Sequence, residues 1–574
     1  MFRNAFSMEH FRHRLAHSEA LPQMVVLGII CGLLCGVVLG SFRLLLEVPL
    51  AHLLPGGESE NFEELSGWYH FFLPVIGSLI IIAILSRVTP LTRKVGVTHL
   101  LERMAYHQSN LPLKNAIVQF LTASTALLFG HSVGKEGPAI HLGATCGSQL
   151  GQKLNLPNNT LRILAGCGTA AGIAATFNTP LAGVVFAMEV VLLEYTVIGF
   201  MPVMVAAATG ALVMQFMFGQ ELVLTVPAMQ IESLSEIPYV AFLGGMIGLL
   251  AVAFISLMRE TMRWSDHSVL TYKTKLIIAG LFTGSVAVFV PQVMGVGYDT
   301  VTSVLNGELG LGILIAILIA KCLLTPVVLG LGIPAGLIGP TFFIGAIAGG
   351  LLGILGAGAV NEQVANPGFY ALLGMGSMMG AVANAPMAAL VAILELTGNP
   401  NIIFPAMISI VVSNLIARYV FNMPSIFVTS MNLQGMDYRY QPLTRVLSSA
   451  AVQSLMSTSF VKCDPIISCA GAKSALDTEP SWIVINNKGR YTLLSPGDLH
   501  STTRDIASDT SDIDMLNIPG LRLDTGFIDT KATLQQALDK MTADGMDALC
   551  IRDNNEQVIG LLTRDQIEEF YRKS

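Results

Sequence analysis

The chain has 574 residues, of which 52% are hydrophobic and only 12% are charged. Soluble proteins carry about 25% charged residues, so this composition excludes a wholly cytosolic protein. The net charge of −7 is small for this length and the basic residues form no long run, so a nucleic-acid partner is not expected. There is no HExxH motif and no CxxC pair, and the eleven histidines are scattered, so no metal site is predicted.

Charged residues make up about 9% of the first 440 residues and about 23% of the remainder. This partition predicts a cytoplasmic segment over 1–22, a membrane domain over 23–430 and a soluble region over 431–574. The first apolar stretch, from about Val25 to Leu54, is long enough to remain as a membrane helix. Arginines precede this stretch, so the positive-inside rule places the N-terminus in the cytoplasm.

The later apolar segments are often short or interrupted by glycine and proline. A bilayer tolerates such breaks only where the backbone is buried in protein or lines a water-filled cavity. We therefore predict an all-α polytopic membrane domain that contains a transport pathway.

Two sequence blocks occur twice in this domain. The first pair is Gly134-Lys135-Glu136-Gly137-Pro138 and, 202 residues later, Gly336-Leu337-Ile338-Gly339-Pro340. The second pair runs from Asn178 to Glu189 and, 206 residues later, from Asn384 to Glu395. We predict an internal duplication with halves of about 23–220 and 235–430. Duplicated halves in transporters are often inverted, with interrupted helices meeting near the midplane.

The glycine-proline blocks predict two helix N-termini inside the membrane. Proline suits the first helical turn, and glycine lets backbone N–H groups approach a ligand. A helix N-terminus carries partial positive charge and unpaired donors. Two such ends aimed at one region would bind an anion without a fixed charge, so that the ion can also leave.

Glu136 is a carboxylate in a membrane, where it is costly unless it has a partner. The same N–H groups that would hold an anion can hold this carboxylate. We predict that ionised Glu136 occupies the anion site and that protonated Glu136 leaves it, which makes Glu136 a gate and a proton carrier. The alternative is that Glu136 only caps a helix or pairs with Lys135.

The soluble region has its own repeat, because Asn486-Asn487 and Leu493-Leu494-Ser495 recur 68 residues later. The predicted copies span about 445–505 and 518–574. Thr533 and Gln536 have capping-box spacing, Gly545 can end that helix, and Thr563 can cap the last helix. The stretch Ser501–Asn517 is predicted to be a solvated loop or connector.

These motifs resemble a known family. Residues 134–138 are similar to the Gly-Arg/Lys-Glu-Gly-Pro signature of CLC chloride channels and chloride/proton exchangers, and residues 336–340 resemble their Gly-x-Phe-x-Pro signature. The soluble region resembles the paired CBS domains that many CLC proteins carry. The resemblance implies an inverted-repeat membrane fold, a homodimer with one pathway per subunit for chloride or a similar anion, and Glu136 as the extracellular-side gate.

Applied to this sequence, the family's motifs imply an anion site formed by three sets of residues. The first set comes from the two glycine-proline blocks and comprises Gly134, Lys135, Gly137, Pro138, Gly336, Leu337, Ile338, Gly339 and Pro340. The other two sets are Gly96, at the position of the family's anion-contacting serine, and Phe427, at the position of its tyrosine. The hydroxyls of that serine and that tyrosine are therefore both missing.

The family's exchangers also have an inner glutamate that relays protons, and this position falls on Val190. Glu189 is rotated by about 100° from it on a helix, which favours a structural contact. Glu194 lies four residues after Val190, on the same predicted helical face, and is the better candidate for an inner relay. Channel-like flux is therefore favoured slightly over proton exchange.

In CBS pairs a Ser/Thr-x-x-Asp segment often contacts an adenine nucleotide. Ser495 and Asp498 keep that spacing, whereas Thr563 and Asp565 belong to a second copy in which Gln566 replaces the last Asp. An adenine nucleotide is thus a possible ligand but no cofactor is required, and a purely dimerising or stabilising role is equally compatible.

Two functions remain open from the sequence, a passive anion channel and a proton-coupled exchanger. A third, a CBS-regulated receptor or enzyme, lacks a catalytic constellation, because the GxSxG pattern at 130–134 follows a membrane helix rather than a strand. We predict that the protein is not an enzyme and lies in a prokaryotic inner membrane, with both termini cytoplasmic.

Overall fold

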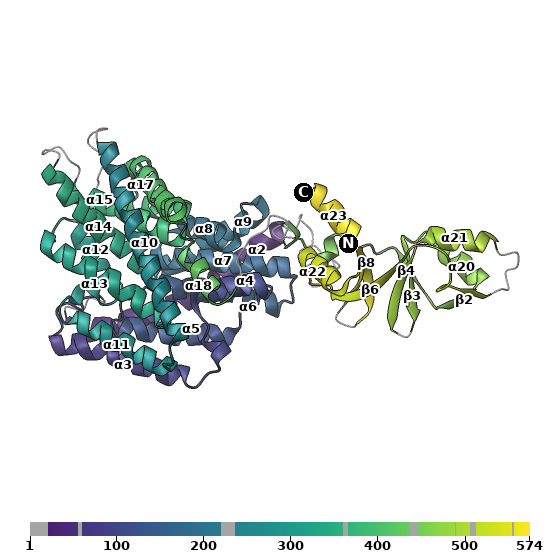
Figure 1. Cartoon of the computed structure of the whole chain (residues 1–574), viewed down its shortest axis with the longest axis horizontal. Helices are drawn as coiled ribbons and strands as arrows, with labels where there is room; N and C mark the ends of the chain where they lie inside the picture. Colours follow the sequence, from purple (N-terminus) through teal and green to yellow (C-terminus); the bar gives the residue numbers. More distant parts are fainter. Residues whose placement is uncertain are drawn as a thin grey trace. The chain divides into compact units, whose positions relative to one another are not determined.

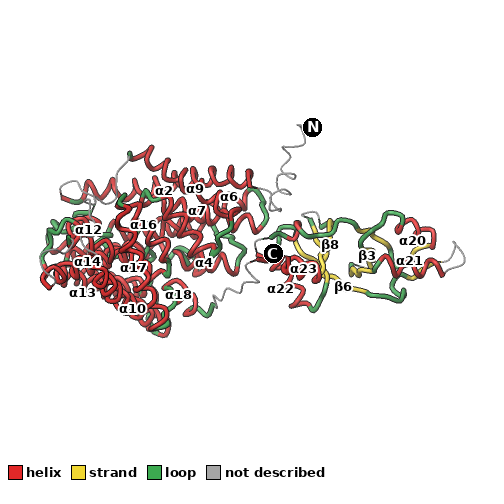
Figure 2. Tube along the Cα trace, turned by 90° about the horizontal axis from the view of Figure 1, so that it is seen from above, coloured by secondary structure: helices red, strands yellow, loops and turns green. Residues whose placement is uncertain are grey.

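The structure is a computed structural model and describes residues 21–55, 60–219, 236–359, 366–436, 446–448, 450–487, 489–505, 512–553 and 556–573. It divides into two compact units. The membrane unit comprises residues 24–153 and 161–438, and the C-terminal unit contains residues 439–574 together with 154–160. The described strands all belong to the C-terminal unit, where Figure 2 shows them in yellow. The segment 1–20, which holds most of the predicted N-terminal segment, lies outside the described residues.

The first half of the membrane unit is helical throughout (Figure 1). Its helices are α2 (Leu21–Leu53), α3 (Gly67–Leu85), α4 (Gly96–Tyr106), α5 (Leu113–Leu128), α6 (Glu136–Lys153), α7 (Asn158–Phe177), α8 (Pro180–Phe186) with a π-helical extension (Ala187–Leu192), and α9 (Val197–Phe218).

The second half is also helical. Its helices are α10 (Ile237–His267), α11 (Tyr272–Ala287), α12 (Tyr298–Leu305), α13 (Leu311–Gly330), α14 (Ile338–Ala359), α15 (Pro367–Ala383), α16 (Pro386–Thr397), α17 (Ile403–Leu415) with a π-helical extension (Ile416–Val420), and α18 (Ile426–Leu433). Among the described residues, eight helices are long and apolar enough to cross a membrane.

Small residues let these helices pack closely. Gly28, Gly32, Gly36 and Gly40 recur every four residues along α2, and a Cβ at each would lie 2.5–2.6 Å from an atom of α9. Such stripes are a common basis of helix association in lipid, where apolar burial alone gives no driving force between helices.

The two Asn-x-Pro blocks form matching breaks between helices. Asn178 separates α7 from α8 and Asn384 separates α15 from α16, and both adopt left-handed backbone conformations with φ of 56° and 55°. Asparagine tolerates this conformation better than most residues do, and the proline two residues later starts the next helix. The duplicated sequence therefore produces the same local structure twice.

The C-terminal unit contains a six-stranded sheet of order β1-β3-β4-β6-β7-β8 and a two-stranded sheet of β2 and β5. In the first copy β1 pairs parallel with β3 and β3 antiparallel with β4, and in the second β6 pairs parallel with β7 and β7 antiparallel with β8. The elements are β1 (Phe460–Cys463), β2 (Ile466–Ser468), α20 (Cys469–Leu476), β3 (Trp482–Asn487), β4 (Arg490–Leu494), α21 (Pro496–Asp505), β5 (Asp512–Asp514), β6 (Arg522–Asp529), α22 (Leu534–Asp544), β7 (Ala548–Arg552), β8 (Val558–Thr563) and α23 (Arg564–Lys573).

The predicted helix caps of this unit are confirmed, but one predicted loop is wrong. Thr533 and Gln536 form a reciprocal capping box on α22, which ends at Gly545 with φ of 64°. The stretch Ser501–Asn517 is not a continuous loop, because α21 extends to Asp505 and β5 follows it. Serine, threonine and aspartate are weak helix formers, and here tertiary packing overrides that preference: Leu499 on α21 and Ile513 on β5 are buried in the same apolar core.

Candidate anion site

The two glycine-proline blocks lie side by side. The backbone N–H of Gly134 donates to the carbonyl oxygen of Gly336 at 2.8 Å, and the N–H of Gly336 donates to the carbonyl oxygen of Gly134, also at 2.8 Å. Helix α6 begins at Glu136 and α14 begins at Ile338, both just after this pair. The structure thus brings together the two predicted helix N-termini.

Glycine is required here because the two backbones leave no room for side chains. A Cβ on Gly137 would lie 2.7 Å from Cα of Gly336. Pro138 and Pro340 are buried, each next to the glycine that begins the opposite block. Neither proline has an N–H that could bind an anion. Their contribution to the predicted site is therefore to fix the starts of α6 and α14.

The carboxylate of Glu136 is bonded to the opposite helix end. Glu136 is 1% exposed. Its Oε2 accepts a hydrogen bond from the backbone N–H of Gly339 at 2.9 Å, and its Oε1 accepts one from the hydroxyl of Tyr298 at 2.6 Å. A carboxylate from one repeat therefore occupies the N-terminus of the equivalent helix in the other repeat.

Sequence reasoning missed Tyr298, although it follows the pattern Gly295-Val296-Gly297 at the end of an apolar segment. Its backbone N–H donates to Oε2 of Glu60 at 2.7 Å. Buried Lys321 supports the preceding loop, because its Nζ donates to the carbonyl oxygens of Gly295 at 3.3 Å and Val296 at 3.1 Å. The phenol that contacts Glu136 is thus held by a long-range polar network.

Two larger cavities are lined by residues of this region. One of about 240 Å³ is lined by residues that include Arg43, Glu60, Lys135 and Tyr298. Nζ of Lys135 lies 5.1 Å from the ring centroid of Tyr298, so the positive charge of Lys135 belongs to this cavity rather than to the paired helix ends.

The second cavity, of about 270 Å³, gathers much of the predicted anion site. Its walls include Gly96, Gly137, Gly336, Leu337, Ile338 and Phe427, together with Arg93 and Lys94. Gly96 starts α4 with φ of 82°, and buried Phe427 comes from α18. Glu136 itself lines a third, much smaller cavity of about 20 Å³, together with Phe177, Ile338 and Phe342.

The glutamates of the second pair of blocks have reciprocal structural contacts. Glu189 accepts hydrogen bonds from the N–H groups of Met387 at 3.2 Å and Ala388 at 2.8 Å, at the start of α16. Glu395 accepts from Leu181 at 2.9 Å and Ala182 at 2.7 Å, at the start of α8. Carboxylates stabilise helix N-termini in this way. Glu189 therefore caps α16. This agrees with the structural contact expected from its rotation by about 100° away from the Val190 position on a helix.

The predicted placement of Glu194 on the helical face of Val190 is wrong. The helix widens into a π-helical segment that ends at Leu192, and Leu193 then adopts a left-handed conformation with φ of 56°. Glu194 consequently lies beyond the helix, so i,i+4 spacing does not apply to it, although its side chain is buried.

In the C-terminal unit, the residues predicted to contact a nucleotide take part in local contacts. Asp498, three residues after Ser495, accepts a hydrogen bond from the N–H of Leu521 at 3.2 Å. Thr563 and Gln566 bond reciprocally at the start of α23, where the Gln566 side chain accepts from the N–H of Thr563 at 2.9 Å, and Asp565 is exposed. The replacement of the last Asp by Gln thus completes a capping box.

Residues 77–418 match the sequence model of the voltage-gated chloride channel family. A putative chloride channel protein ClcB-like of Ralstonia nicotianae is 27% identical over 63% of this chain and 86% of its own length. The H⁺/Cl⁻ exchange transporter ClcA of Vibrio cholerae serotype O1 is 29% identical over 51% of this chain and 64% of its own length.

Solved structures share the fold. A slow cyanobacterial Cl⁻/H⁺ antiporter aligns with a TM-score of 0.64 and 21% identity, over 72% of this chain and 98% of its own. A eukaryotic CLC transporter aligns with a TM-score of 0.59 and 18% identity, over 95% of this chain and 98% of its own. The proteins of this family are channels and transporters, not enzymes. Because the family model covers more than half of its residues, this chain belongs to the voltage-gated chloride channel family.

Proposed function

We propose that this protein transports chloride or a similar small anion across a membrane and that Glu136 is its gate. The observation that carries this proposal is the Glu136 carboxylate on the Gly339 N–H, at the N-terminus of α14. An ionised carboxylate there competes with an anion for the same donor. Protonation removes the charge that holds the side chain, so the gate opens as the pH falls.

The flux is channel-like or only weakly coupled to protons. Val190 stands where an inner carboxylate would be, and Glu189 already caps α16. Proton exchange through a different inner relay, for which Glu194 is the buried candidate, is the second function considered. The relatives named as a chloride channel protein and as exchange transporters are compatible with both.

The C-terminal unit is proposed to be a pair of CBS domains, supported by its two copies with the same pattern of strand pairing. Its ligand, where it has one, would be an adenine nucleotide near Ser495 and Asp498. A homodimer in a prokaryotic inner membrane, with both termini cytoplasmic, completes the proposal and rests on the sequence resemblance and the arginines near the N-terminus.

The test is chloride efflux from vesicles that contain the purified full-length protein, measured across a range of pH. Wild-type efflux is expected to rise as the pH falls. Glu136→Gln is expected to keep the efflux but lose most of its pH dependence, because an amide carries no charge to titrate. Glu260→Gln is the matched control, since Glu260 is an exposed carboxylate on α10. An unchanged pH profile in Glu136→Gln would refute the gate.

A further inference from the structure

Lys321 is a fully buried lysine in the middle of α13, where a positive charge is costly. Its Nζ donates to the carbonyl oxygens of Gly295 at 3.3 Å and Val296 at 3.1 Å, and it lies 4.0 Å from the centroid of the Phe343 ring. Among the residues that the structure describes, no carboxylate forms an ion pair with it. Carbonyl oxygens and a ring face compensate a buried charge only in part, so this lysine needs an explanation.

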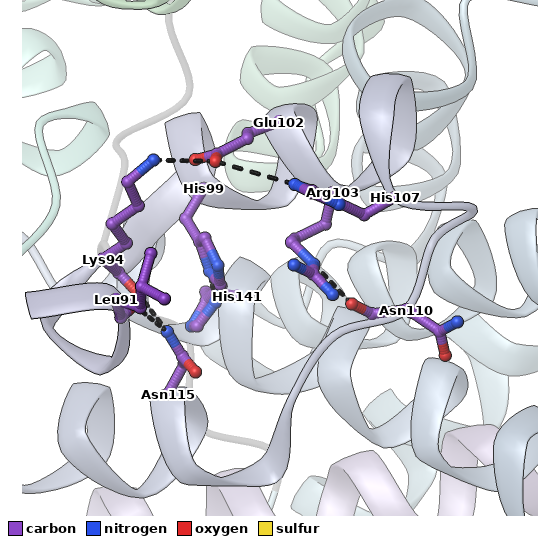
Figure 3. Close-up of polar contacts among 9 residues, drawn as sticks. All are labelled: Leu91, Lys94, His99, Glu102, Arg103, His107, Asn110, Asn115 and His141. Carbon is purple, nitrogen blue, oxygen red and sulfur yellow. Dashed lines mark hydrogen bonds and ion pairs between the residues drawn. The ribbon is translucent and has the colours of Figure 1, made fainter. Parts of the chain in front are cut away.

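Lys94 offers a contrast, which Figure 3 shows. Its Nζ lies 2.7 Å from Oε1 of Glu102 and its side chain is 41% exposed, so a counter-ion and water both compensate its charge. His99 and His141, drawn in the same view, lie 2.9 Å apart from Nδ1 to Nε2 and can bond as neutral rings. Lys321, by comparison, is buried away from water and has no directly bonded counter-ion in the described part of the chain.

The carbonyl contacts of Lys321 lead to the Tyr298 hydroxyl. Both carbonyl oxygens belong to the turn that precedes Tyr298. Gly297 in this turn has φ of 82°, and a Cβ there would lie 2.6 Å from the Phe343 ring and 3.4 Å from Nζ of Lys321. The turn is therefore packed directly against the lysine, and the phenol that follows it donates to Glu136 at 2.6 Å.

The ring contact of Lys321 leads to the other partner of the Glu136 carboxylate. Phe343 lies four residues, or about one helical turn, after Gly339 on α14. The N–H of Gly339 donates to Oε2 of Glu136 at 2.9 Å. Lys321 thus contacts both elements that hold the carboxylate, the turn before Tyr298 and α14.

Carboxylates surround this lysine. Those close enough to act electrostatically on it come from the segment before α3, from α6 and from α12: Glu60, Glu63, Glu136 and Asp299. Lys135, the other cation of this group, acts on Glu60, whose Oε2 already accepts from the N–H of Tyr298 at 2.7 Å. Because the carboxylates outnumber the lysines, the loss of one positive charge leaves the ionised form of Glu136 less favourable.

We infer that Lys321 is a positioning residue for the gate, because its positive charge keeps the Glu136 carboxylate ionised on the Gly339 N–H and thereby lowers the pH at which the gate opens. This inference rests on the proposed Glu136 gate. A positive charge in an interior of low dielectric favours a nearby carboxylate in its ionised form. Without that charge Glu136 takes up a proton more readily, so the gate opens at a higher pH.

The experiment measures the midpoint of the pH profile of chloride efflux from vesicles that contain the full-length protein. Lys321→Gln keeps a donor for the backbone carbonyls but has no charge, so its midpoint is expected to move up by about one pH unit. Lys321→Arg keeps the charge, so its midpoint is expected to stay close to that of wild type. Lys275→Gln is the matched control, because Nζ of Lys275 also donates to a backbone carbonyl, that of Ser265 on α10.

A double variant separates the charge of Lys321 from mechanical support. If Lys321 acted only by holding the Tyr298 phenol, Tyr298→Phe would abolish the effect of Lys321→Gln. An effect of charge predicts instead that the upward shift persists in Tyr298→Phe. The same effect predicts no shift in Glu136→Gln, where there is no carboxylate to titrate.

Several outcomes would overturn the inference. An unchanged midpoint in Lys321→Gln does so, and so do equal shifts in Lys321→Gln and Lys321→Arg. A shift that disappears in Tyr298→Phe, or loss of chloride efflux in both Lys321 variants, assigns the lysine a purely structural role. The gate is tested separately by Glu136→Gln. A flat profile in Glu136→Gln with an unmoved midpoint in Lys321→Gln leaves the gate standing, whereas a wild-type profile in Glu136→Gln refutes the gate and this inference with it.

Discussion

The two halves of the membrane unit match in one pair of blocks and differ in the other. In the Asn-x-Pro blocks each half contributes a glutamate that caps a helix of the other half, Glu189 on α16 and Glu395 on α8. In the glycine-proline blocks the position of Glu136 corresponds to Ile338, which has no charge to offer.

The two kinds of contact therefore differ in their expected roles, since the repeated one is structural and the single one is functional. Contacts made twice by equivalent residues fix how the halves pack. The contact made once, from Glu136 to the N–H of Gly339, is the one that a change of protonation can break. A nearly symmetric frame thus surrounds the asymmetric contact that we propose as the gate.

The largest effect is expected from a substitution at Gly339, whose backbone N–H binds the Glu136 carboxylate. In Gly339→Ala the new Cβ would lie 2.7 and 2.8 Å from the two carboxylate oxygens of Glu136. The flexible Glu136 side chain must then leave the helix end. Chloride efflux is expected to lose most of its pH dependence, as measured in vesicles. Gly245→Ala is the control, because its Cβ would meet only one side-chain atom, at 3.5 Å. A wild-type pH profile in Gly339→Ala would show that the carboxylate does not need this site.

The second-largest effect is expected from the two equivalent helix caps, Glu189 and Glu395. Glu189→Ala and Glu395→Ala each remove a carboxylate that accepts two backbone N–H groups. Each is expected to lower the free energy of unfolding by about 2–4 kcal/mol. Thermal unfolding of the full chain in detergent, with Glu260→Ala for comparison, measures this loss. A much smaller loss at one glutamate than at the other would break the proposed symmetry.

Removing the second partner of the gate should have a smaller effect. Tyr298→Phe deletes the hydroxyl that donates to Glu136 and leaves the ring in place. A hydrogen bond to a charged group contributes about 1.5 kcal/mol or more, so chloride efflux at neutral pH is expected to rise about tenfold. Tyr239→Phe removes a hydroxyl that donates to a backbone carbonyl elsewhere and should leave efflux unchanged. Equal efflux in the two variants would argue against a role for Tyr298 in closing the gate.

The smallest effect extends the comparison to the two copies in the C-terminal unit. Thr533 caps α22 with a complete capping box, whereas Ser468 caps α20 only by accepting from the N–H of Gly471. Thr533→Ala should destabilise its helix by about 1 kcal/mol and Ser468→Ala by about half as much. Hydrogen exchange of the two helices in the full chain measures both losses, and the reverse order would contradict the assignment of the stronger cap.

Local patterns made much of this architecture predictable from the sequence. Composition separated a membrane unit from a more highly charged C-terminal unit, and glycine followed by proline located the starts of α6 and α14. The capping residues Thr533 and Thr563 were also readable, because a cap depends on residues three positions apart.

Tertiary structure decided what joins distant residues. Tyr298 and Glu136 are 162 residues apart, and Glu189 bonds to residues almost 200 positions away. His99 and His141 meet only because α4 packs on α6. Glu194 was misplaced because a π-helical segment and the left-handed Leu193 end the helix, which periodicity does not encode. The sequence by itself thus determined the helix starts and the repeated frame. The partners of each buried charge depended on packing, because a low-dielectric interior forces polar groups to bond to whichever donors the fold brings near.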